Sequence, residues 1–210
     1  MAAALEPDLV PAAIERAVEI VMPGWIDDDE LVQLERRYGD RLLLVERFAD
    51  GTLLVTPPSG WAGGRNDTEL ILQVGNWARA GNHGVVMGGT GGVRLPDGSV
   101  FAPDATYFSS ERWAAADAAR TFAEALPDAV FEVLSRSDRR RTTLKKMAAY
   151  LRNSVRLAVL IDPKRRKVYA GREGEAEPRD LGDVERFDCS PVMPGFVLDV
   201  AAIVRAGLPR

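Results

Sequence analysis

The sequence is poor in the residue types that build disulfides and zinc sites. It has one cysteine, Cys189, and one histidine, His83. A single cysteine cannot form a disulfide within the chain, so nothing here requires an oxidising compartment. Cys189 is interpreted as a small buried hydrophobe. One histidine and one cysteine also provide too few ligands for the usual tetrahedral zinc site.

The sequence also lacks long apolar runs. No stretch is long and apolar enough to span a bilayer. The segment from Met1 to Leu5 has neither the basic start nor the apolar run of a signal peptide. We therefore expect a cytoplasmic protein that does not bind a membrane.

The residues that are present give the composition of an ordinary globular protein. Of 210 residues, 46% are hydrophobic and 28% are charged. This length allows one large domain or at most two small ones. No internal repeat or low-complexity linker divides the chain. We expect an acidic, helical N-terminal segment over residues 1–40, packed on a core domain over residues 41–210.

Charge is distributed unevenly along the chain, although the net charge is only −4. Residues 1–40 contain ten acidic and three basic residues, whereas residues 136–167 contain twelve basic and two acidic ones. The basic block, with Arg139, Arg140 and Arg141 near its start, is a candidate surface for a phosphate backbone. Two alternatives stay open: a solvated helix face followed by a basic turn, or a surface for an acidic partner such as the N-terminal segment itself.

Periodicity predicts a mixed α/β fold. Apolar residues at helical spacing predict helices over residues 12–21, from the acids at 27–30 to residue 38, over 66–80, and from a cap at Ser137 or Asp138 to Arg152. Strand-like runs occupy residues 41–48, 52–56, 99–108, 129–134, 156–161 and 167–170. Asp50 and Gly51 predict a hairpin between the first two. Residues 171–185 read as a loop, and residues 194–204 as a short closing strand or helix.

Three acidic residues interrupt or adjoin apolar strands, where a charge is costly unless it is compensated. Glu46 follows Leu44 and Val45, Asp104 follows Pro103, and Glu132 lies between Phe131 and Val133. Each of them alone could be an edge-strand acid that faces solvent. Together they suggest a site for Mg²⁺ or Mn²⁺, the divalent ions that prefer hard oxygen ligands.

These acids belong to an ordered set of landmarks that resembles a known family. The landmarks are Pro103–Asp104, residues 131–137, Lys146, Tyr150 and residues 160–163, with residues 46–51, 57–60 and 65–66 upstream and 194–199 downstream. In this order they resemble the Uma-type family of restriction endonucleases, a branch of the PD-(D/E)XK nuclease superfamily. The similarity covers the chain from about Trp25 to its C-terminus.

The resemblance implies a restriction-endonuclease-like PD-(D/E)XK core, in which a mixed β-sheet is flanked by helices. It assigns Asp104 and Glu132 as catalytic, metal-binding acids and Glu46 as the early glutamate of the metal site. The lysine normally two residues after the second acid is absent, because Leu134 stands there. Lys146, in the following helix, matches it instead. Asn66, where many members have histidine, and Arg136, where many have proline, depart from the pattern.

Pattern and resemblance disagree about Lys146. On a helical wheel it lies nearly opposite the stripe of Leu144, Met147 and Leu151, as a solvated lysine would. The resemblance makes it catalytic, with Lys145 as the alternative. Glu69 and Gln73 on the preceding helix could line the same cleft or simply face solvent.

The function expected from these residues is a Mg²⁺-dependent or Mn²⁺-dependent endonuclease that hydrolyses DNA phosphodiester bonds, with Arg139, Arg140 and Arg141 binding the nucleic acid. Many nucleases cut both strands of DNA as two-fold symmetric dimers, so a homodimer is compatible with this function. The alternatives are a nucleic-acid-binding module that keeps the fold without useful turnover, and an interaction protein whose basic block binds an acidic partner.

Overall fold

The computed structural model describes residues 14–115, 122 and 125–208. Its helices are α1 (Asp28–Tyr38), α2 (Trp61–Gly81), α3 (Ser110–Ala114), α4 (Arg140–Arg152) and α5 (Val200–Ala206), with a 3₁₀ turn at Gly39–Arg41. Its strands are β1 (Val18–Ile20), β2 (Leu44–Arg47), β3 (Leu53–Thr56), β4 (Gly84–Gly88), β5 (Val93–Arg94), β6 (Val100–Phe101), β7 (Ala105–Ser109), β8 (Ala129–Val133), β9 (Leu157–Asp162), β10 (Lys167–Arg172), β11 (Arg179–Gly182), β12 (Arg186–Asp188) and β13 (Val197–Asp199).

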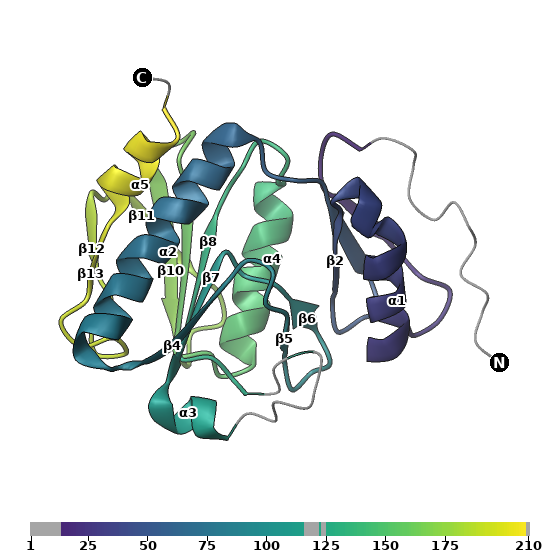
Figure 1. Cartoon of the computed structure of the whole chain (residues 1–210), viewed down its shortest axis with the longest axis horizontal. Coiled ribbons are helices and arrows are strands. Elements are labelled where there is room, and N and C mark those ends of the chain that lie inside the picture. The colour runs from purple at the N-terminus through teal and green to yellow at the C-terminus, as the bar shows by residue number, and fades with distance from the viewer. Residues whose placement is uncertain (1–13, 116–121, 123–124, 209–210) are drawn as a thin grey trace.

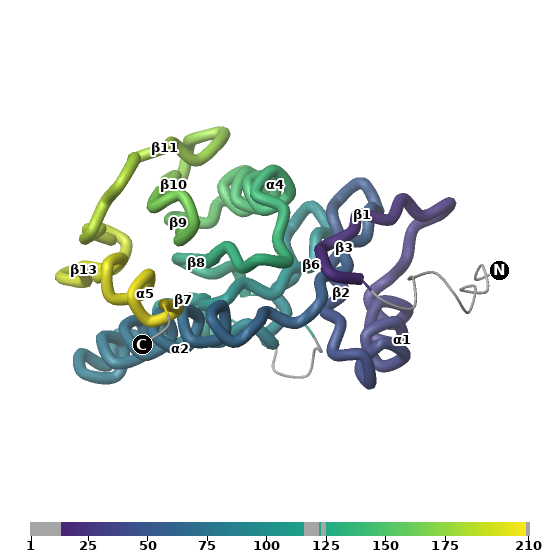
Figure 2. The backbone as a smooth tube through the Cα atoms, turned by 90° about the horizontal axis from the view of Figure 1, so that it is seen from above, coloured from purple at the N-terminus to yellow at the C-terminus, as the bar shows by residue number. Residues whose placement is uncertain are grey.

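The larger sheet has six strands in the order β11-β10-β9-β8-β7-β4. Strands β8 and β9 run parallel and are connected by α4, while the other neighbouring pairs are antiparallel. Helices α2 and α5 cover one face of this sheet and α4 covers the other (Figures 1 and 2). This mixed sheet between helices confirms the predicted fold class.

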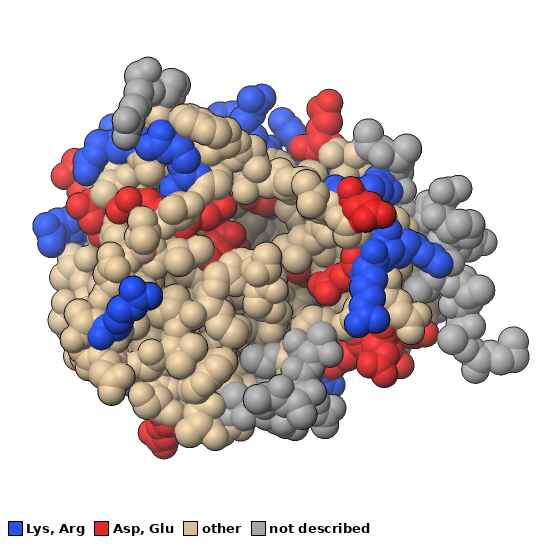
Figure 3. Space-filling model, viewed as in Figure 1, with Lys and Arg blue, Asp and Glu red and all other residues tan. Residues whose placement is uncertain are grey.

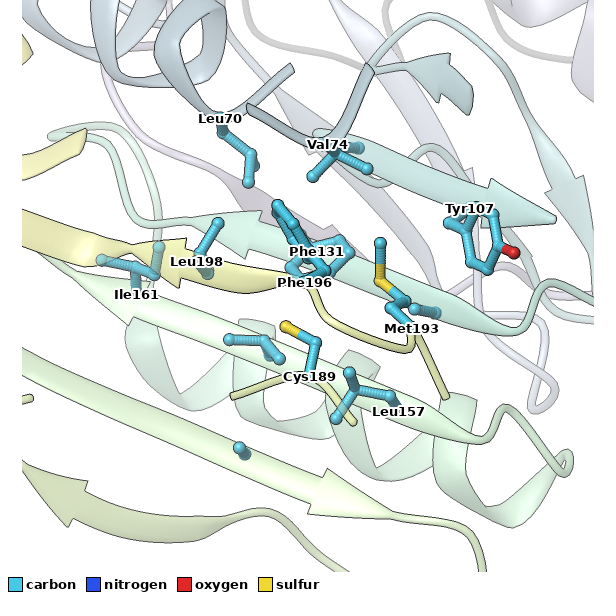
Figure 4. Close-up of a cluster of buried hydrophobic side chains, with 14 of the residues drawn as sticks. Leu70, Val74, Tyr107, Phe131, Leu157, Ile161, Cys189, Met193, Phe196 and Leu198 are labelled. Carbon is cyan, nitrogen blue, oxygen red and sulfur yellow. The ribbon is translucent and has the colours of Figure 1, made fainter. Parts of the chain in front are cut away.

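Alternation along β8 and β9 decides which side chains face which helix, because successive residues of a strand point to opposite faces. Phe131 and Ile161 point toward α2 and pack with Leu70 and Val74 (Figure 4). Val130 lies on the other face, in the cluster that contains Met147 of α4. Glu132, one residue after Phe131, therefore projects to the α4 side of the sheet.

The smaller sheet has five strands in the order β1-β3-β2-β6-β5, and α1 packs on it. Asp27 caps α1 by accepting a hydrogen bond from the Glu30 backbone, and the Glu30 side chain accepts one from the Asp27 backbone. The N-terminal elements stand to one side of the large sheet, and α4 lies between them and strands β8 to β10 (Figure 2). The surface in Figure 3 is hollowed between these two parts.

Three expectations about local structure were wrong. Residues 14–20 do not form a helix; they contain β1, which pairs with β3, and residues 12 and 13 lie outside the described residues. The expected loop over 171–185 contains β11, which pairs with β10. Neither Ser137 nor Asp138 caps α4: Arg139 occupies the N-cap position without a side-chain hydrogen bond, and Asp138 accepts one from Ser135 N. The division at residue 40 stays a prediction.

In the described part of the chain, none of the helices combines the length and apolar character that crossing a membrane requires. The hairpin predicted at Asp50 and Gly51 is present: β2 and β3 pair antiparallel from Leu44 with Thr56 to Arg47 with Leu53. Gly51 has φ +82° in the turn, a conformation that favours glycine.

A fully buried arginine fastens the N-terminal elements together. Arg47 on β2 donates hydrogen bonds to the Ile26 carbonyl at 2.7 Å and to the Gly98 carbonyl at 2.8 Å, and it pairs with Asp28 at 2.6 Å. The Trp25 ring covers its guanidinium at 4.5 Å. One side chain thus connects α1, β2 and the turn before β6.

We predict that Arg47→Met lowers the free energy of unfolding by about 3–5 kcal/mol, the usual loss when one partner of a buried ion pair is removed. The two carbonyl oxygens would lose the Arg47 donor, and the Asp28 carboxylate would keep Arg94, at 2.9 Å, but not Arg47. Chemical denaturation monitored by circular dichroism measures this change. Arg36→Met, at an exposed position of α1, is the matched control, and equal losses in the two variants would contradict the assignment.

Candidate active site

The structure brings four of the predicted residues to one place between the two sheets. Glu46 comes from β2, Asp104 precedes β7, Glu132 comes from β8, and Lys146 lies on the second turn of α4. All four line a small pocket of about 70 Å³. Glu46, Glu132 and Lys146 are buried and Asp104 is partly buried.

Lys146 is the centre of this group. Its Nζ lies 2.9 Å from Glu46 Oε1 and 2.8 Å from Glu132 Oε1, and 5.6 Å from the centroid of the Phe101 ring. The helical-wheel interpretation of Lys146 as a solvated residue is wrong, since only 5% of it is exposed. The helical wheel correctly placed Met147 and Leu151 on the face of α4 that packs on the large sheet. The side of α4 that carries Lys146 is covered by the small sheet, through Glu46 of β2.

Strand register places the two main acids opposite each other. Ala105 of β7 pairs with Phe131 of β8, so the same antiparallel register extended by one residue sets Asp104 against Glu132. Asp104 Oδ2 accepts a hydrogen bond of 2.7 Å from the Val133 backbone. Tyr150, one turn beyond Lys146, donates its hydroxyl to Glu132 Oε1 at 3.2 Å. Both carboxylates are therefore held in position by neighbours in the fold.

Burial and mutual repulsion shift the protonation of these groups. Burial, and then the Glu132 and Asp67 carboxylates, raise the pKa of Asp104 well above its usual range, against the bond from Val133 N. Burial raises the pKa of Glu132 to about 7, with Lys146 opposing it and Glu46 adding to it. Burial disfavours the ammonium form of Lys146, but Glu132 and Glu46 outweigh it, so the pKa of Lys146 lies above its usual value.

Two further carboxylates near the pocket escaped the sequence analysis. Burial raises the pKa of Asp67 on α2 to about 6, although Ser59 donates a hydrogen bond to it; Asp138 adds to the rise. Asp138 lines the pocket and also contributes to the raised pKa of Glu132. Asp67 lies on the polar flank of a helix, where a sequence pattern offers no signal for a functional carboxylate.

The other predicted residues lie elsewhere. Lys145 is half exposed and pairs with Glu19 at 3.1 Å, away from the four-residue group. Gln73 lines no part of the pocket, because its amide exchanges hydrogen bonds with the backbone of Asp199 at 2.8 and 3.1 Å and so fastens α2 to β13. Glu69 accepts from Gln73 at 3.0 Å.

The three arginines at the start of α4 are all exposed but differ in their surroundings. Arg140 donates to the Tyr169 hydroxyl at 3.0 Å, so its guanidinium is held on β10. Arg139 lines the acid pocket, and Arg141 lines a neighbouring hollow. Neither Arg139 nor Arg141 makes a side-chain hydrogen bond or ion pair with another described residue. The block is therefore not one uniform surface.

The carboxylates of this pocket could bind a magnesium ion if water and substrate phosphate complete its coordination shell. Over the described residues, no three His, Cys, Asp or Glu side chains are grouped closely enough to hold a metal by themselves. Mg²⁺ is usually bound by one or two carboxylates and completes its shell with water and substrate phosphate. Asp104 and Glu132 are the two carboxylates that could form such a pair, and burial and neighbouring carboxylates raise the pKa of both.

Residues 28–201 match the model of the family Uma2, described as "Putative restriction endonuclease". The chain belongs to the Uma2 family. The match includes every residue of the four-residue group, together with Asp67 and Asp138.

A solved structure shows the same fold as this Uma2 chain. It is described as "a putative nuclease belonging to DUF820 from Anabaena variabilis ATCC 29413". The TM-score is 0.67 at 15% sequence identity, and the similarity covers 78% of this chain and 91% of the other. No match was found among curated proteins.

The raised pKa values predict how the stability of this Uma2 protein depends on pH without divalent ions. An acid with a raised pKa binds more protons in the folded state than in the unfolded state, so stability is greatest below the unfolded value and falls as pH rises through about 7, the pKa of Glu132. One unit of pKa is worth about 1.4 kcal/mol, or about 2–4 °C in Tm for a chain of this size. We expect Tm in EDTA to fall by at least that much between about pH 5.5 and about pH 8.

Asp104→Asn should flatten this fall, because it removes one titrating carboxyl and its repulsion of Glu132. Asp40→Asn, at an exposed position, should leave the pH dependence as in the parent. Thermal unfolding by circular dichroism across this pH range measures all three proteins. An undiminished slope in Asp104→Asn would exclude Asp104 as a source of the effect.

Proposed function

We propose that this protein is a metal-dependent endonuclease that hydrolyses phosphodiester bonds in DNA. The observation that carries the proposal is the Lys146 ammonium, held within 2.9 Å of two buried glutamates beside Asp104. Membership of the Uma2 family supports a nuclease. The same fold hosts other functions elsewhere, so the proposal depends on the site.

Asp104 and Glu132 are the residues that would hold Mg²⁺ or Mn²⁺. When bound, such an ion makes water a stronger nucleophile at neutral pH and polarises a phosphoryl oxygen. Glu46 uses Oε1 for both the Lys146 ammonium and the Ala102 backbone, which donates at 2.8 Å. The resemblance implies that Glu46 also binds the metal, and its Oε2 is the oxygen not used by these two contacts.

Lys146 has two tasks in this proposal. In the free protein its positive charge offsets the repulsion between buried carboxylates, which would otherwise be costly to enclose. With substrate bound, the same ammonium would orient the attacking water and stabilise the negative charge that develops on the phosphate. Tyr150 acts as a positioning residue, because its hydroxyl fixes the Glu132 carboxylate.

One observation favours a second candidate, a nucleic-acid-binding module without useful turnover. The ammonium of Lys146 pairs with both Glu46 and Glu132, and no group of three acids is preformed among the described residues. A protein that has lost metal binding would keep such an internal ion pair. Metal-dependent stabilisation separates the two candidates.

Cutting both strands of a duplex at once requires two centres. A two-fold homodimer would supply them through one interface used twice. We therefore include a homodimer in the proposal, and light scattering at working concentrations measures it.

The primary test is cleavage of plasmid and single-stranded DNA with added Mg²⁺ or Mn²⁺. We expect cleavage that EDTA abolishes, and a metal-dependent rise in Tm, because only the folded state gathers the ligands. Asp104→Asn should lose both. A parent protein that neither gains stability from the ions nor cuts either substrate would refute the nuclease proposal.

Lys146→Met should reduce turnover at saturating substrate and metal by about 10²-fold or more, the effect of removing one electrostatic stabiliser. Methionine retains the bulk of the side chain, and Tm measured in assay buffer shows whether the variant is folded. Lys164→Met, at an exposed turn position, is the matched control. Parent-like turnover in Lys146→Met would make Lys146 a structural residue only.

The arginines of α4 should differ in DNA affinity. Arg139→Ala and Arg141→Ala remove guanidinium groups with no partner among the described side chains, so each should lower affinity and reduce the slope of log K against log salt by about 1. Arg140→Ala removes the same charge from the same helix turn, but its guanidinium is engaged by Tyr169, so its effect should be smaller. Fluorescence anisotropy over a salt series measures the three slopes. Slopes that match the slope of the parent in all three variants would make the whole block a solvated surface.

A further inference from the structure

The start of α4 carries charge of an unexpected sign. Anions are favoured at a helix N-terminus and cations are not, yet Arg139, Arg140 and Arg141 stand there, and the first turn contains no acid. The missing acid comes from another element: Glu19 of β1 reaches this turn from the edge of the small sheet.

The Glu19 carboxylate is held by two residues of α4. One oxygen accepts a hydrogen bond of 2.6 Å from the Thr142 hydroxyl, and the other lies 3.1 Å from Lys145 Nζ. The hydrogen bond from Thr142 lowers the pKa of Glu19 and outweighs burial, which raises it. Lys145 and Arg139 lower the pKa further. The carboxylate is therefore ionised at neutral pH.

This contact lies in a hollow that adjoins the acid pocket. A space of about 470 Å³ is lined by Val18, Glu19, Arg139, Arg141, Thr142 and Lys145. Arg139 and Thr142 also line the acid pocket, and Thr142 precedes Lys146 by four residues, about 6 Å along the helix. A hydroxyl, an ammonium and two guanidinium groups that make no side-chain hydrogen bond or ion pair with another described residue thus surround a space beside Lys146.

We propose that this hollow binds a backbone phosphate of the nucleic acid next to the bond that is cut, and that Glu19 occupies the phosphate position in the free protein. A carboxylate and a phosphate oxygen accept the same hydrogen bonds from Thr142 and Lys145, so substrate binding requires Glu19 to withdraw. Only one third of the Glu19 side chain is exposed, but it comes from a three-residue edge strand that pairs on one side. The inference rests on the proposed function, because it names where that substrate lies.

A binding experiment on an Asp104→Asn background in EDTA tests this site without cleavage. The probe is a short, fluorescently labelled single-stranded DNA oligonucleotide, and anisotropy gives Kd. Glu19→Gln should tighten binding about two- to fivefold, the value of the exposed ion pair that it removes, because the Gln amide oxygen can still accept from Thr142. Glu15→Gln, in the same segment and exposed, makes the same charge change and should alter Kd by less than about twofold.

Two further variants separate local competition from net charge. Glu19→Asp keeps the charge but shortens the side chain by one methylene group, so it should also tighten binding if the contact matters. Lys145→Ala should weaken binding, and it should reduce the gain from Glu19→Gln in the double variant, since neighbours that share an interaction are not additive. Lys145→Ala also keeps the test decisive if a Glu19 variant is unstable.

The outcomes are distinct from those of the nuclease test. Unchanged or weaker binding by Glu19→Gln and Glu19→Asp overturns the phosphate site, even if the parent cleaves DNA. Equal tightening by Glu15→Gln and Glu19→Gln overturns it too, because the effect would then be general charge. Tighter binding that is specific to Glu19, in a protein that cuts no DNA, would leave the site standing and refute only the nuclease.

Discussion

The ion pair of Lys146 with Glu46 and Glu132 is the interaction on which the centre of this molecule depends. Two carboxylates and an ammonium share an almost closed space between the sheets, where each charge alone would be costly to bury. The lysine brings together three elements that are distant in sequence, namely β2, β8 and α4. Because one ammonium satisfies both acids, the two sheets have a defined position relative to each other at this point.

The charges at this centre do not cancel. Glu46, Asp104 and Glu132 together provide three carboxylates, and Lys146 provides one positive charge. Burial and this excess of negative charge raise the pKa values of Asp104 and Glu132. Such a site favours the binding of a proton or a cation, and strongly shifted pKa values are common in active sites. The same situation recurs with opposite sign at the start of α4, where two of the three arginines and Lys145 surround Glu19, which reaches them from β1.

Features that depend on a local sequence pattern could be predicted from the sequence alone. Glu132 could be located because it interrupts an apolar strand, and Gly51 because its hairpin needs a glycine. The position of Lys146 required a family resemblance, because its burial arises from the small sheet, which is distant in sequence. Glu19 and Arg47 could not be predicted for the same reason: their partners on α4 and in the turn at Gly98 lie 123 and 51 residues away. Residues 14–20 were misjudged because a short edge strand is stabilised by its neighbour and not by its own periodicity.

The placement of Glu132 and Lys146 restricts where this chain can change length during evolution. A one-residue insertion within β8 before Glu132 would turn the glutamate to the α2 face of the sheet, since side chains alternate. An insertion in α4 before Lys146 would rotate the lysine by about 100° around the helix axis. The connection from Leu134 to Arg139 belongs to neither element, so insertions and deletions between the two residues should be tolerated only there. Members of the family are therefore expected to vary in the spacing between acid and lysine through this connection alone.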